Sequence, residues 1–367
     1  MRKKAIFYKK NFLIYGFGKS GFASYKFLYK KNDCKIFDDN KKNIPLKYKH
    51  KIINYKQLKK ITIDYIVISP GIDINRCKLT RYLKKNNSKI ITELDIFYLS
   101  YPNIKKITIT GTNGKSTTSK LLYDVLKEHK KDARLSGNIG SPILLEKGFK
   151  NSTLFVIEAS SYQLEYSKFF KSDYSLILNL SPDHLERHGS FKKYIKAKFK
   201  LIKNQSKNNY AFIENKNNLL NNLINKKKIK SKIFRVNYKR YQKYDRLITN
   251  LYFKNNSNIK NLSFIFALSK KLKLSFNKII KVVNKFKGLD FRQQIVYKSK
   301  KLTIINDSKS TSLSSSLPLL NSFKNIYWIL GGLAKKGDVL KLKKEKFTNI
   351  NAFIYGRDKF FFSKILS

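Results

Sequence analysis

A glycine-flanked turn that ends in lysine and serine follows a run of strand-forming residues in this chain. Residues 107–110 read Ile-Thr-Ile-Thr, and the next six read Gly-Thr-Asn-Gly-Lys-Ser before a helical pattern begins. Glycines let backbone N–H groups converge on phosphate oxygens, Lys115 adds a positive charge, and the Ser116 hydroxyl can hold a magnesium ion. This order of strand, loop and helix predicts a site for ATP or GTP.

The spacing of this loop differs from that of the standard P-loop. Only Thr112 and Asn113 separate Gly111 from Gly114, where the standard pattern places four residues between its glycines. We therefore expect a variant loop. The alternative is a Gly-Asn turn followed by an ordinary lysine-rich helix, but the strand–loop–helix order favours the phosphate site.

Three further side chains that could do chemistry follow strand-like runs. Glu158 ends an apolar run, where its carboxylate could reach a magnesium ion held by Ser116; a surface glutamate is the alternative. His184 lies in a loop that holds two of the chain's 4 histidines, and it could ligate a metal or a phosphate or simply form a turn. Lys309 could meet a phosphate, although a solvated surface lysine is the simpler interpretation.

The N-terminal segment carries a dinucleotide-type glycine pattern. Gly16, Gly18 and Gly21 follow an apolar run, and Asp38 ends a second such run about 20 positions further on. Taken alone, this pattern predicts NAD, because the acidic residue could hold a ribose hydroxyl. The pattern is only moderately specific, so another nucleotide diphosphate could occupy the same place.

Strand-like runs alternate with helical patterns along the chain. The alternation predicts an α/β protein whose parallel sheets bind ligands outside the carboxyl ends of their strands. The length of 367 residues indicates two or three domains. We expect a Rossmann-like domain at 1–92, a central P-loop ATPase-like domain with a parallel sheet at 93–289, and a shortened Rossmann-like domain with three strands at 290–367. The boundaries of elements within 200–260 are hard to place.

The composition is strongly basic, with 79 Lys and Arg against 23 Asp and Glu and a net charge of +56. The lysines are scattered through every segment and no nucleic-acid motif accompanies them, so we expect no specific nucleic-acid partner. The charge should still attract anionic substrates such as nucleotides. No apolar run has the length of a membrane span, and the N-terminal apolar stretch is too short for a signal peptide, so we expect a cytoplasmic protein without a membrane partner.

Taken together, the motifs resemble those of the Mur ligases. They occur in the family's order and approximate spacing, at 111–116, 137–140, 158–165, 182–184 and 306–309. The strings Ser-Ser-Tyr-Gln-Leu-Glu and Pro-Asp-His-Leu-Glu-Arg-His-Gly-Ser are most similar to the branch of the family that adds D-glutamate. The resemblance extends from Gly16 to about Gly356.

The resemblance implies an ATP-dependent ligase of peptidoglycan precursor synthesis. ATP, with Mg²⁺, would phosphorylate the carboxylate of UDP-N-acetylmuramoyl-L-alanine, and the amine of D-glutamate would attack the acyl phosphate. In this family the first domain binds the uridine diphosphate end of the substrate without NAD. We expect a monomer. Another Mur-type or folylpolyglutamate-type amide ligase, or a nucleotide-binding remnant that catalyses nothing, are the open alternatives.

The resemblance also assigns roles to individual residues. The catalytic residues would be Lys115, Glu158, His184, Lys198 and Lys309. The residues that contact ATP would be Gly111, Thr112, Asn113, Gly114, Lys115, Ser116, Thr117, Asn258, Arg292 and Asp307. The metal ligands would be Ser116, Glu158, His184 and Lys198, the last at the position of a lysine that is carbamylated in the family. The residues that contact the other substrates would be Gly16, Gly18, Ser20, Gly21, Asp38, Asn138, Ser160, Gln163, Lys309 and Thr311.

Two departures from the family pattern occur in the last segment. Residues 288–292 read Gly-Leu-Asp-Phe-Arg where the family usually has Gly-Leu-Pro-His-Arg. The further strands and the Ser-Pro-rich motif that follow the equivalent of Gly356 in the family are missing, which suggests a truncated product, a fragment or a degenerating enzyme. We expect the shorter domain to weaken D-glutamate capture more than ATP binding.

Overall fold

The computed structural model describes residues 6–253, 256–310, 312–334, 340, 342 and 347–366. Thr311, expected on the amino-acid side of the site, lies outside these residues. The chain folds into two compact units, the first containing 1–110, 130–177 and 195–234, and the second containing 111–129, 178–194 and 235–367. The three-domain boundaries expected from the sequence stay predictions.

A four-stranded parallel sheet forms the N-terminal part of the first unit. Its strand order is β2-β1-β3-β4. The strands are buried on both faces, as at Phe12, Leu13 and Ile14, which are 0% exposed, so apolar residues run continuously along them. The strands and α-helices are β1 (Asn11–Tyr15), α1 (Lys19–Leu28), β2 (Asp33–Phe37), α2 (Tyr55–Leu58), β3 (Tyr65–Ile68), α3 (Thr80–Lys85) and β4 (Ile90–Ile91).

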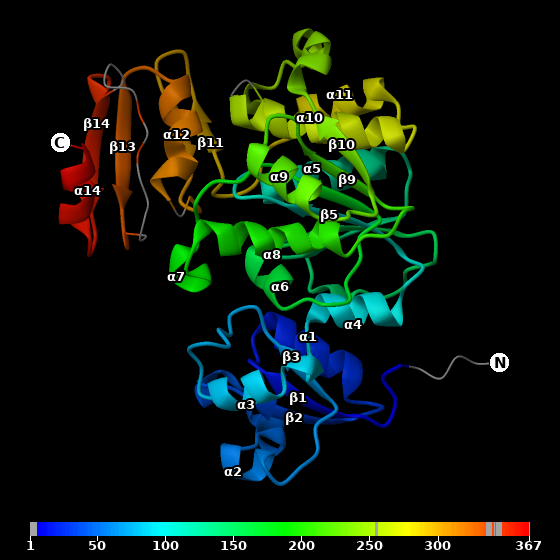
Figure 1. Ribbon diagram of the computed structural model, residues 1–367. Coiled ribbons are helices and arrows are strands. Elements are labelled where there is room, and N and C mark those ends of the chain that lie inside the picture. The colour runs from blue at the N-terminus through cyan, green and yellow to red at the C-terminus, as the bar shows by residue number, and fades with distance from the viewer. Residues whose placement is uncertain are drawn as a thin grey trace. The chain divides into compact units, whose positions relative to one another are not determined.

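A six-stranded sheet of order β10-β9-β8-β5-β7-β6 follows (Figure 1). The pairs from β6 through β9 are parallel, which confirms the expected α/β class with parallel sheets. Because β5 lies between β7 and β8, its carboxyl end opens at the middle of the sheet, where α/β proteins bind ligands. The elements are α4 (Glu93–Ser100), β5 (Lys105–Thr110), β6 (Ala133–Gly137), β7 (Leu154–Glu158), α6 (Ser161–Glu165), β8 (Tyr174–Ile177), α8 (Phe191–Lys203), β9 (Tyr210–Glu214), α9 (Asn218–Lys226) and β10 (Lys232–Val236).

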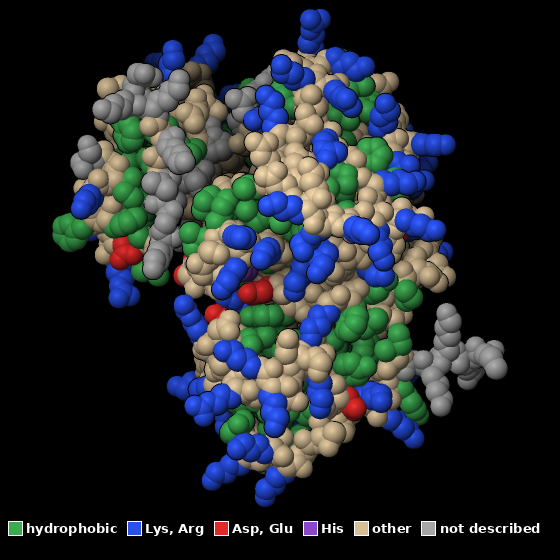
Figure 2. All heavy atoms as spheres, in the orientation of Figure 1, with side chains coloured by type: hydrophobic (Ala, Val, Ile, Leu, Met, Phe, Trp, Pro, Cys, Tyr) green, Lys and Arg blue, Asp and Glu red, His purple; other side chains and the backbone are tan. Residues whose placement is uncertain are grey.

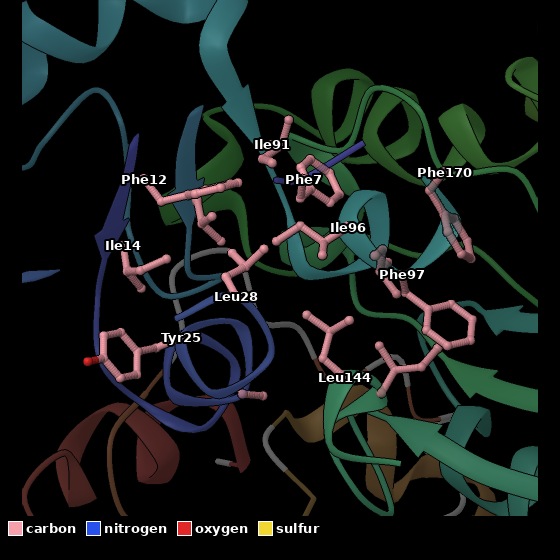
Figure 3. Packing of buried hydrophobic residues seen from close by; sticks show 14 of the residues in the cluster. Phe7, Phe12, Ile14, Tyr25, Leu28, Ile91, Ile96, Phe97, Leu144 and Phe170 are labelled. Atoms are coloured by element: carbon pink, nitrogen blue, oxygen red, sulfur yellow. The ribbon is translucent and has the colours of Figure 1, made fainter. Parts of the chain in front are cut away.

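Helices α1 and α4 and the short helix η4 (Ile143–Leu145) share one hydrophobic core. Figure 3 shows Leu28 of α1, Ile96 and Phe97 of α4 and Leu144 of η4 lying near one another. These four side chains are at most 6% exposed, and each contributes about 1.5–3 kcal/mol through burial. The core therefore fixes α1, the helix that begins directly after the glycine-rich loop.

The Asp95 carboxylate ties α4 to the segment between α6 and β8. It is 0% exposed and accepts hydrogen bonds from the N–H groups of residues 168–170 at 2.7–3.2 Å and from Ser167 Oγ at 2.8 Å. It also accepts hydrogen bonds from Thr92, in the capping box that begins α4. A buried carboxylate with donors on two segments fixes the distance between them.

The second unit contains α5 (Lys115–Glu128), which packs against α10 (Asn256–Lys271) and α11 (Phe276–Lys285). The short helix α7 (Leu185–His188) also belongs to this unit. The elements that follow are β11 (Gln294–Lys298), β12 (Thr303–Asn306), α12 (Leu313–Ser322), β13 (Ile326–Gly331), β14 (Ile350–Tyr355) and α14 (Lys359–Leu366).

The strands of the last segment form two small sheets. β11 and β12 pair antiparallel, and β13 and β14 pair parallel. The sequence did not predict β11, whose residues 295–298 are exposed. One face of the β13–β14 pair packs in a small core with Leu313, Leu330 and Phe362. Alternate residues are 56–73% exposed, namely Tyr327, Ile329, Phe353 and Tyr355.

Lysine and arginine side chains are scattered over the face seen in Figure 2 and do not gather in one stripe. The expectation of no specific nucleic-acid partner stays a prediction. Among the described helices, none combines the length and the hydropathy that crossing a membrane requires.

Replacing Asp95 with alanine would leave the buried N–H groups of residues 168–170 without their acceptor. We expect the free energy of unfolding, measured by urea denaturation, to fall by about 3 kcal/mol. Asp64→Ala is the matched control, because Asp64 accepts one exposed hydrogen bond from Asn11 N–H at 2.8 Å. It should cost less than about 1 kcal/mol. Equal losses for the two variants would contradict the role given to Asp95.

Candidate functional site

The loop after β5 has the geometry of an anion site. Gly114 has φ +79°, and an added Cβ would lie 2.0 Å from Asn261 Nδ2, so this position requires glycine. The N-cap of α5 is Gly114, which has no side chain to cap the helix, and the N–H groups of a helix's first turn are the donors that an anion can use. Lys115 Nζ donates to the carbonyls of Gly111 and Thr112 at 2.9 and 2.7 Å, which holds the ammonium over the loop.

Residues 179–181 form hydrogen bonds that support the loop. Asn179 pairs with Asn113 twice: its Oδ1 accepts from the Asn113 N–H at 2.8 Å, and its Nδ2 donates to the Asn113 carbonyl at 2.9 Å. Thr112 Oγ1 accepts from the Ser181 N–H at 3.0 Å and lies 3.0 Å from the Tyr194 hydroxyl. Three of the expected loop residues, Thr112, Asn113 and Gly114, therefore lie against side chains to which the sequence analysis gave no role. These side chains are Tyr194, Asn179 and Asn261.

Glu158 ends β7 with a buried carboxylate. Its Oε1 accepts from Asn138 Nδ2 at 2.8 Å, and its Oε2 is buried without a hydrogen-bond donor among the described residues. A buried oxygen without a partner costs about 1–3 kcal/mol or more, so this atom is suited to a bound cation. A negatively charged oxygen is the ligand type that Mg²⁺ prefers, and the residues present thus fit the expected metal.

Lys198 of α8 is 1% exposed, unlike the many lysines of the surface. Its Nζ donates to Thr110 Oγ1 at 3.3 Å, which places the amine at the carboxyl end of β5. The sequence pattern alone could not distinguish this lysine from its neighbours Lys196 and Lys200. Burial and the contact with Thr110 now do so.

His184 lies in a left-handed backbone conformation, with φ 54°. Its Nε2 is 3.3 Å from Asp183 Oδ2 and its Nδ1 is 3.6 Å from Glu186 Oε1. Within the described residues, no three His, Cys, Asp or Glu side chains gather as a metal cluster. The expected metal set, which also draws on Ser116 and Lys198, stays a prediction.

Two expected substrate residues form the start of α6. Ser160 Oγ accepts from the Gln163 N–H at 3.2 Å, and Gln163 Oε1 accepts from the Ser160 N–H at 2.9 Å. This capping box gives the N–H groups of Ser160 and Gln163 hydrogen-bond acceptors at the start of the helix. Both side chains already have local partners, so contact with a substrate would have to use their remaining hydrogen-bonding capacity.

The glycines in the glycine-rich loop of the first unit have different surroundings. A Cβ on Gly21 would lie 1.8 Å from the Gly16 carbonyl oxygen, while a Cβ on Gly18 would have nothing within 4 Å. Asp38 Oδ2 accepts from the Phe17 N–H at 2.6 Å, so this carboxylate shapes the loop itself. Ser69 Oγ donates to the Gly16 carbonyl at 2.6 Å. The arrangement leaves room for a phosphate at Gly18 and at the uncapped start of α1.

Ser20 is hydrogen-bonded to a buried acid that the sequence analysis did not single out. Its hydroxyl donates to Glu93 Oε2 at 2.5 Å, and the N–H of Leu144 donates weakly to Glu93 Oε1 at 3.5 Å. Burial raises the pKa of Glu93 to about 7 against these hydrogen bonds, which lower it. The Ser20 hydroxyl therefore points toward Glu93, the first residue of α4.

Three expected residues of the third segment, which begins at Gly288, gather with Asn258 of α10 around Gln293. Asn258 Nδ2 donates to Gln293 Oε1 at 3.2 Å, and Asp307 Oδ1 accepts from the Gln293 N–H at 3.0 Å. Burial raises the pKa of Asp307, and the nearby charge of Arg292 opposes that shift. The Lys309 N–H donates to the carbonyl of the residue before Arg292 at 3.0 Å. Asn258, Arg292, Asp307 and Lys309 thus lie in one cluster.

Comparison with known proteins bears on what this arrangement is. A model of the Mur ligase middle domain matches residues 109–279, which include the phosphate loop, Glu158, His184 and Lys198. The UDP-N-acetylmuramoylalanine--D-glutamate ligase of Rickettsia bellii is 31% identical over 379 residues, covering 97% of this chain and 84% of that protein. The chain belongs to the Mur ligase family. The enzyme class expected from the sequence, an ATP-dependent ligase, is confirmed.

Other relatives and solved structures agree with this assignment. The protein of the same name from Francisella tularensis subsp. novicida is 36% identical to this Mur ligase over 303 residues, which cover 81% of this chain and 70% of that one. UDP-N-acetylmuramate-alanine ligase MurC from Thermotoga maritima superposes with a TM-score of 0.54 at 17% identity, over 95% of this chain and 90% of that one. MurF ligase from Thermotoga maritima, solved with ADP, gives a TM-score of 0.52 at 14% identity, covering 81% of this chain and 77% of that one. The structural likeness supports the fold of the Mur ligase.

The two glycines of the first loop give a matched pair of variants. We expect Gly21→Ala to lower the thermal unfolding midpoint by several degrees, because its Cβ meets the Gly16 carbonyl. Gly18→Ala should leave that midpoint unchanged and weaken binding of UDP-N-acetylmuramoyl-L-alanine about 10-fold in calorimetry, because its Cβ fills the space left for phosphate. Normal binding by a folded Gly18→Ala variant would rule out a phosphate at this loop.

Glu93 should make stability depend on pH. Its pKa is about 7 in the folded protein against an ordinary value of 4.5, so its favourable contribution to stability is present below pH 4.5 and is lost as the pH rises through 7. We expect Glu93→Gln, which stays neutral, to remove a fall of about 3 kcal/mol in the free energy of unfolding between pH 4.5 and 8. Urea denaturation across this range measures it, with Glu214→Gln as the control. A profile unchanged by Glu93→Gln would refute the assignment.

Proposed function

We propose that this Mur ligase joins D-glutamate to UDP-N-acetylmuramoyl-L-alanine with the hydrolysis of ATP to ADP and phosphate. The observation that carries the proposal is the glycine loop at the start of α5, with the Lys115 ammonium held over it by the carbonyls of Gly111 and Thr112. The choice of amino acid comes from the curated relatives, whose name is that of a D-glutamate ligase and which match over 81–97% of the chain. Peptidoglycan precursor synthesis is the process this reaction serves.

The phosphoryl transfer needs positive charge around the γ-phosphate of ATP. The substrate carboxylate attacks the γ-phosphorus, and ADP leaves with the bond between the β- and γ-phosphates broken. In the resting protein, Lys115 Nζ bonds to carbonyls of its own loop, and phosphate oxygens would take over those bonds. The N–H groups at the start of α5 would hold the same phosphates.

The second step forms the amide bond. The amine of D-glutamate attacks the acyl carbon, inorganic phosphate leaves, and the amine loses one proton. The cluster of Arg292, Asp307 and Lys309 lies on the segment expected to carry the amino-acid side. Lys309 is the residue of this cluster that we assign to the phosphate and the amino acid.

Mg²⁺, when bound, would neutralise phosphate charge and orient the transferring group. Glu158 Oε2 is the atom best suited to hold it, because it is anionic, buried and without a donor among the described residues. Ser116, His184 and Lys198 complete the ligand set that we propose. Asn138 would keep Glu158 oriented through its hydrogen bond to Oε1.

We place the nucleotide-sugar substrate at the glycine-rich loop of the first unit, with its phosphates near Gly18 and the uridine near Asp38. We also propose that the enzyme acts as a monomer in the cytoplasm, where ATP and nucleotide sugars are available. The described part of the chain contains no helix that could cross a membrane.

Phosphate release by the purified chain tests the proposal. With ATP, Mg²⁺ and UDP-N-acetylmuramoyl-L-alanine, we expect release to require D-glutamate. Glu158→Gln should lower kcat about 100-fold at fixed Mg²⁺ and recover in part when Mg²⁺ is raised. The control is Glu214→Gln, which changes a half-buried carboxylate at the end of β9 and should leave the rate unchanged.

Three results would overturn the proposal. Release that depends on another amino acid would assign a different Mur-type reaction. ATP binding without release would identify a nucleotide-binding protein without ligase activity. An equal rate for Glu158→Gln at all Mg²⁺ concentrations would remove Glu158 from the metal site.

A further inference from the structure

Tyr252 stands between the phosphate-loop helix and the turn that leads into the third segment. Its hydroxyl lies 2.9 Å from Thr117 Oγ1, in the first turn of α5 and next to Ser116. The sequence analysis gave Tyr252 no role. Burial raises the pKa of its hydroxyl, so the group stays neutral and can donate or accept the bond to Thr117.

The ring of Tyr252 packs against Gly288, where the third segment begins. A Cβ on Gly288 would lie 3.1 Å from Tyr252 Cε2, and Gly288 has φ +80°, so the turn requires glycine both for its backbone and for the ring beside it. Edge-on contacts with Phe253 and Phe286, with centroids 5.2 and 5.6 Å away, hold the ring in place.

The backbone of Tyr252 is linked to the same segment by a second route. Its carbonyl accepts from Asn258 Nδ2 at 2.8 Å, and this amide also donates to Gln293 Oε1 at 3.2 Å. The Gln293 N–H in turn donates to Asp307 at 3.0 Å. One residue thus contacts the helix that begins at the phosphate loop and, through ring and carbonyl, the segment that carries Asp307.

We propose that Tyr252 is a positioning residue that couples nucleotide binding at the 111–116 loop to the turn at 288–293. A nucleotide that orders the first turn of α5 also orders the Thr117 hydroxyl, and the bond to Tyr252 then favours one position of the ring against Gly288. A ligand shifts such an equilibrium only through contacts that differ between the two states, and this hydrogen bond is such a contact. The inference rests on the proposed function, because the nucleotide is taken to be that of the ligase.

Hydrogen exchange at residues 286–293 tests the coupling directly. In the wild-type chain, saturation with the non-hydrolysable analogue AMP-PNP and Mg²⁺ should slow exchange in this segment several-fold. In Tyr252→Phe, AMP-PNP should bind within about 2-fold of its wild-type affinity while the added protection is lost. Thr117→Val, at its own saturating concentration, and the double variant should lose the same protection and no more.

Tyr244→Phe is the matched control. Tyr244 lies in the same unit, packs against Phe266 with tilted rings and stacks on Phe276, and its hydroxyl has no partner among the described residues. It should keep the wild-type response. In turnover assays, Tyr252→Phe should lower kcat about 10-fold and leave KM for ATP nearly unchanged. A general loss of stability would not give this combination of a lower kcat and an unchanged KM.

Each outcome decides one proposal. Wild-type exchange that does not respond to AMP-PNP, or Tyr252→Phe exchange that responds normally, would overturn the coupling even if phosphate release requires D-glutamate. A wild-type response that Tyr252→Phe abolishes would support the coupling even if no phosphate is released, and only the proposed ligase function would then fail.

Discussion

A loop that binds phosphate must keep a fixed backbone shape, and that shape has to come from contacts with other parts of the fold. In this Mur ligase that support comes from two asparagines. The side-chain amide of Asn179 forms two hydrogen bonds with the backbone of Asn113, one through its oxygen and one through its nitrogen. Asn261 occupies the space that a side chain at Gly114 would need. These contacts use the N–H groups of Thr112 and Asn113 and fix the backbone that leads into the first turn of α5.

Buried carboxylates show how differently the same group can be used. Asp95 accepts hydrogen bonds from donors of two segments and links those segments to each other. Glu93 has one short hydrogen bond and one long one, so burial dominates and its pKa rises to about 7. Glu158 keeps one oxygen without a donor among the described residues, which is the state expected of a ligand awaiting a cation. The number of donors that the fold supplies therefore separates a structural acid from a functional one.

The fold class was predictable because its signals are local. The buried parallel strands read as apolar runs, and the glycine-rich turns follow them directly. What the sequence could not reveal were the partners of those turns, since Asn179 and Asn261 are 66 and 148 positions from Asn113. The sequence could not single out Lys198 for a related reason: only its burial and its contact with Thr110 distinguish it from neighbouring lysines. The strand β11 was also missed; its apolar run is limited to Ile295, Val296 and Tyr297, between Gln294 and Lys298.

The exposed face of the β13–β14 pair has a consequence for handling the protein. Tyr327, Ile329, Phe353 and Tyr355 present apolar surface to water, while the chain as a whole carries a net charge of +56. Mutual repulsion between molecules then opposes contact between these faces, and the repulsion acts over about 10 Å at 0.1 M salt and about 3 Å at 1 M. Colloidal stability is thus set by ionic strength: the salt that screens nonspecific binding of nucleic acid also lets the apolar faces of two molecules approach.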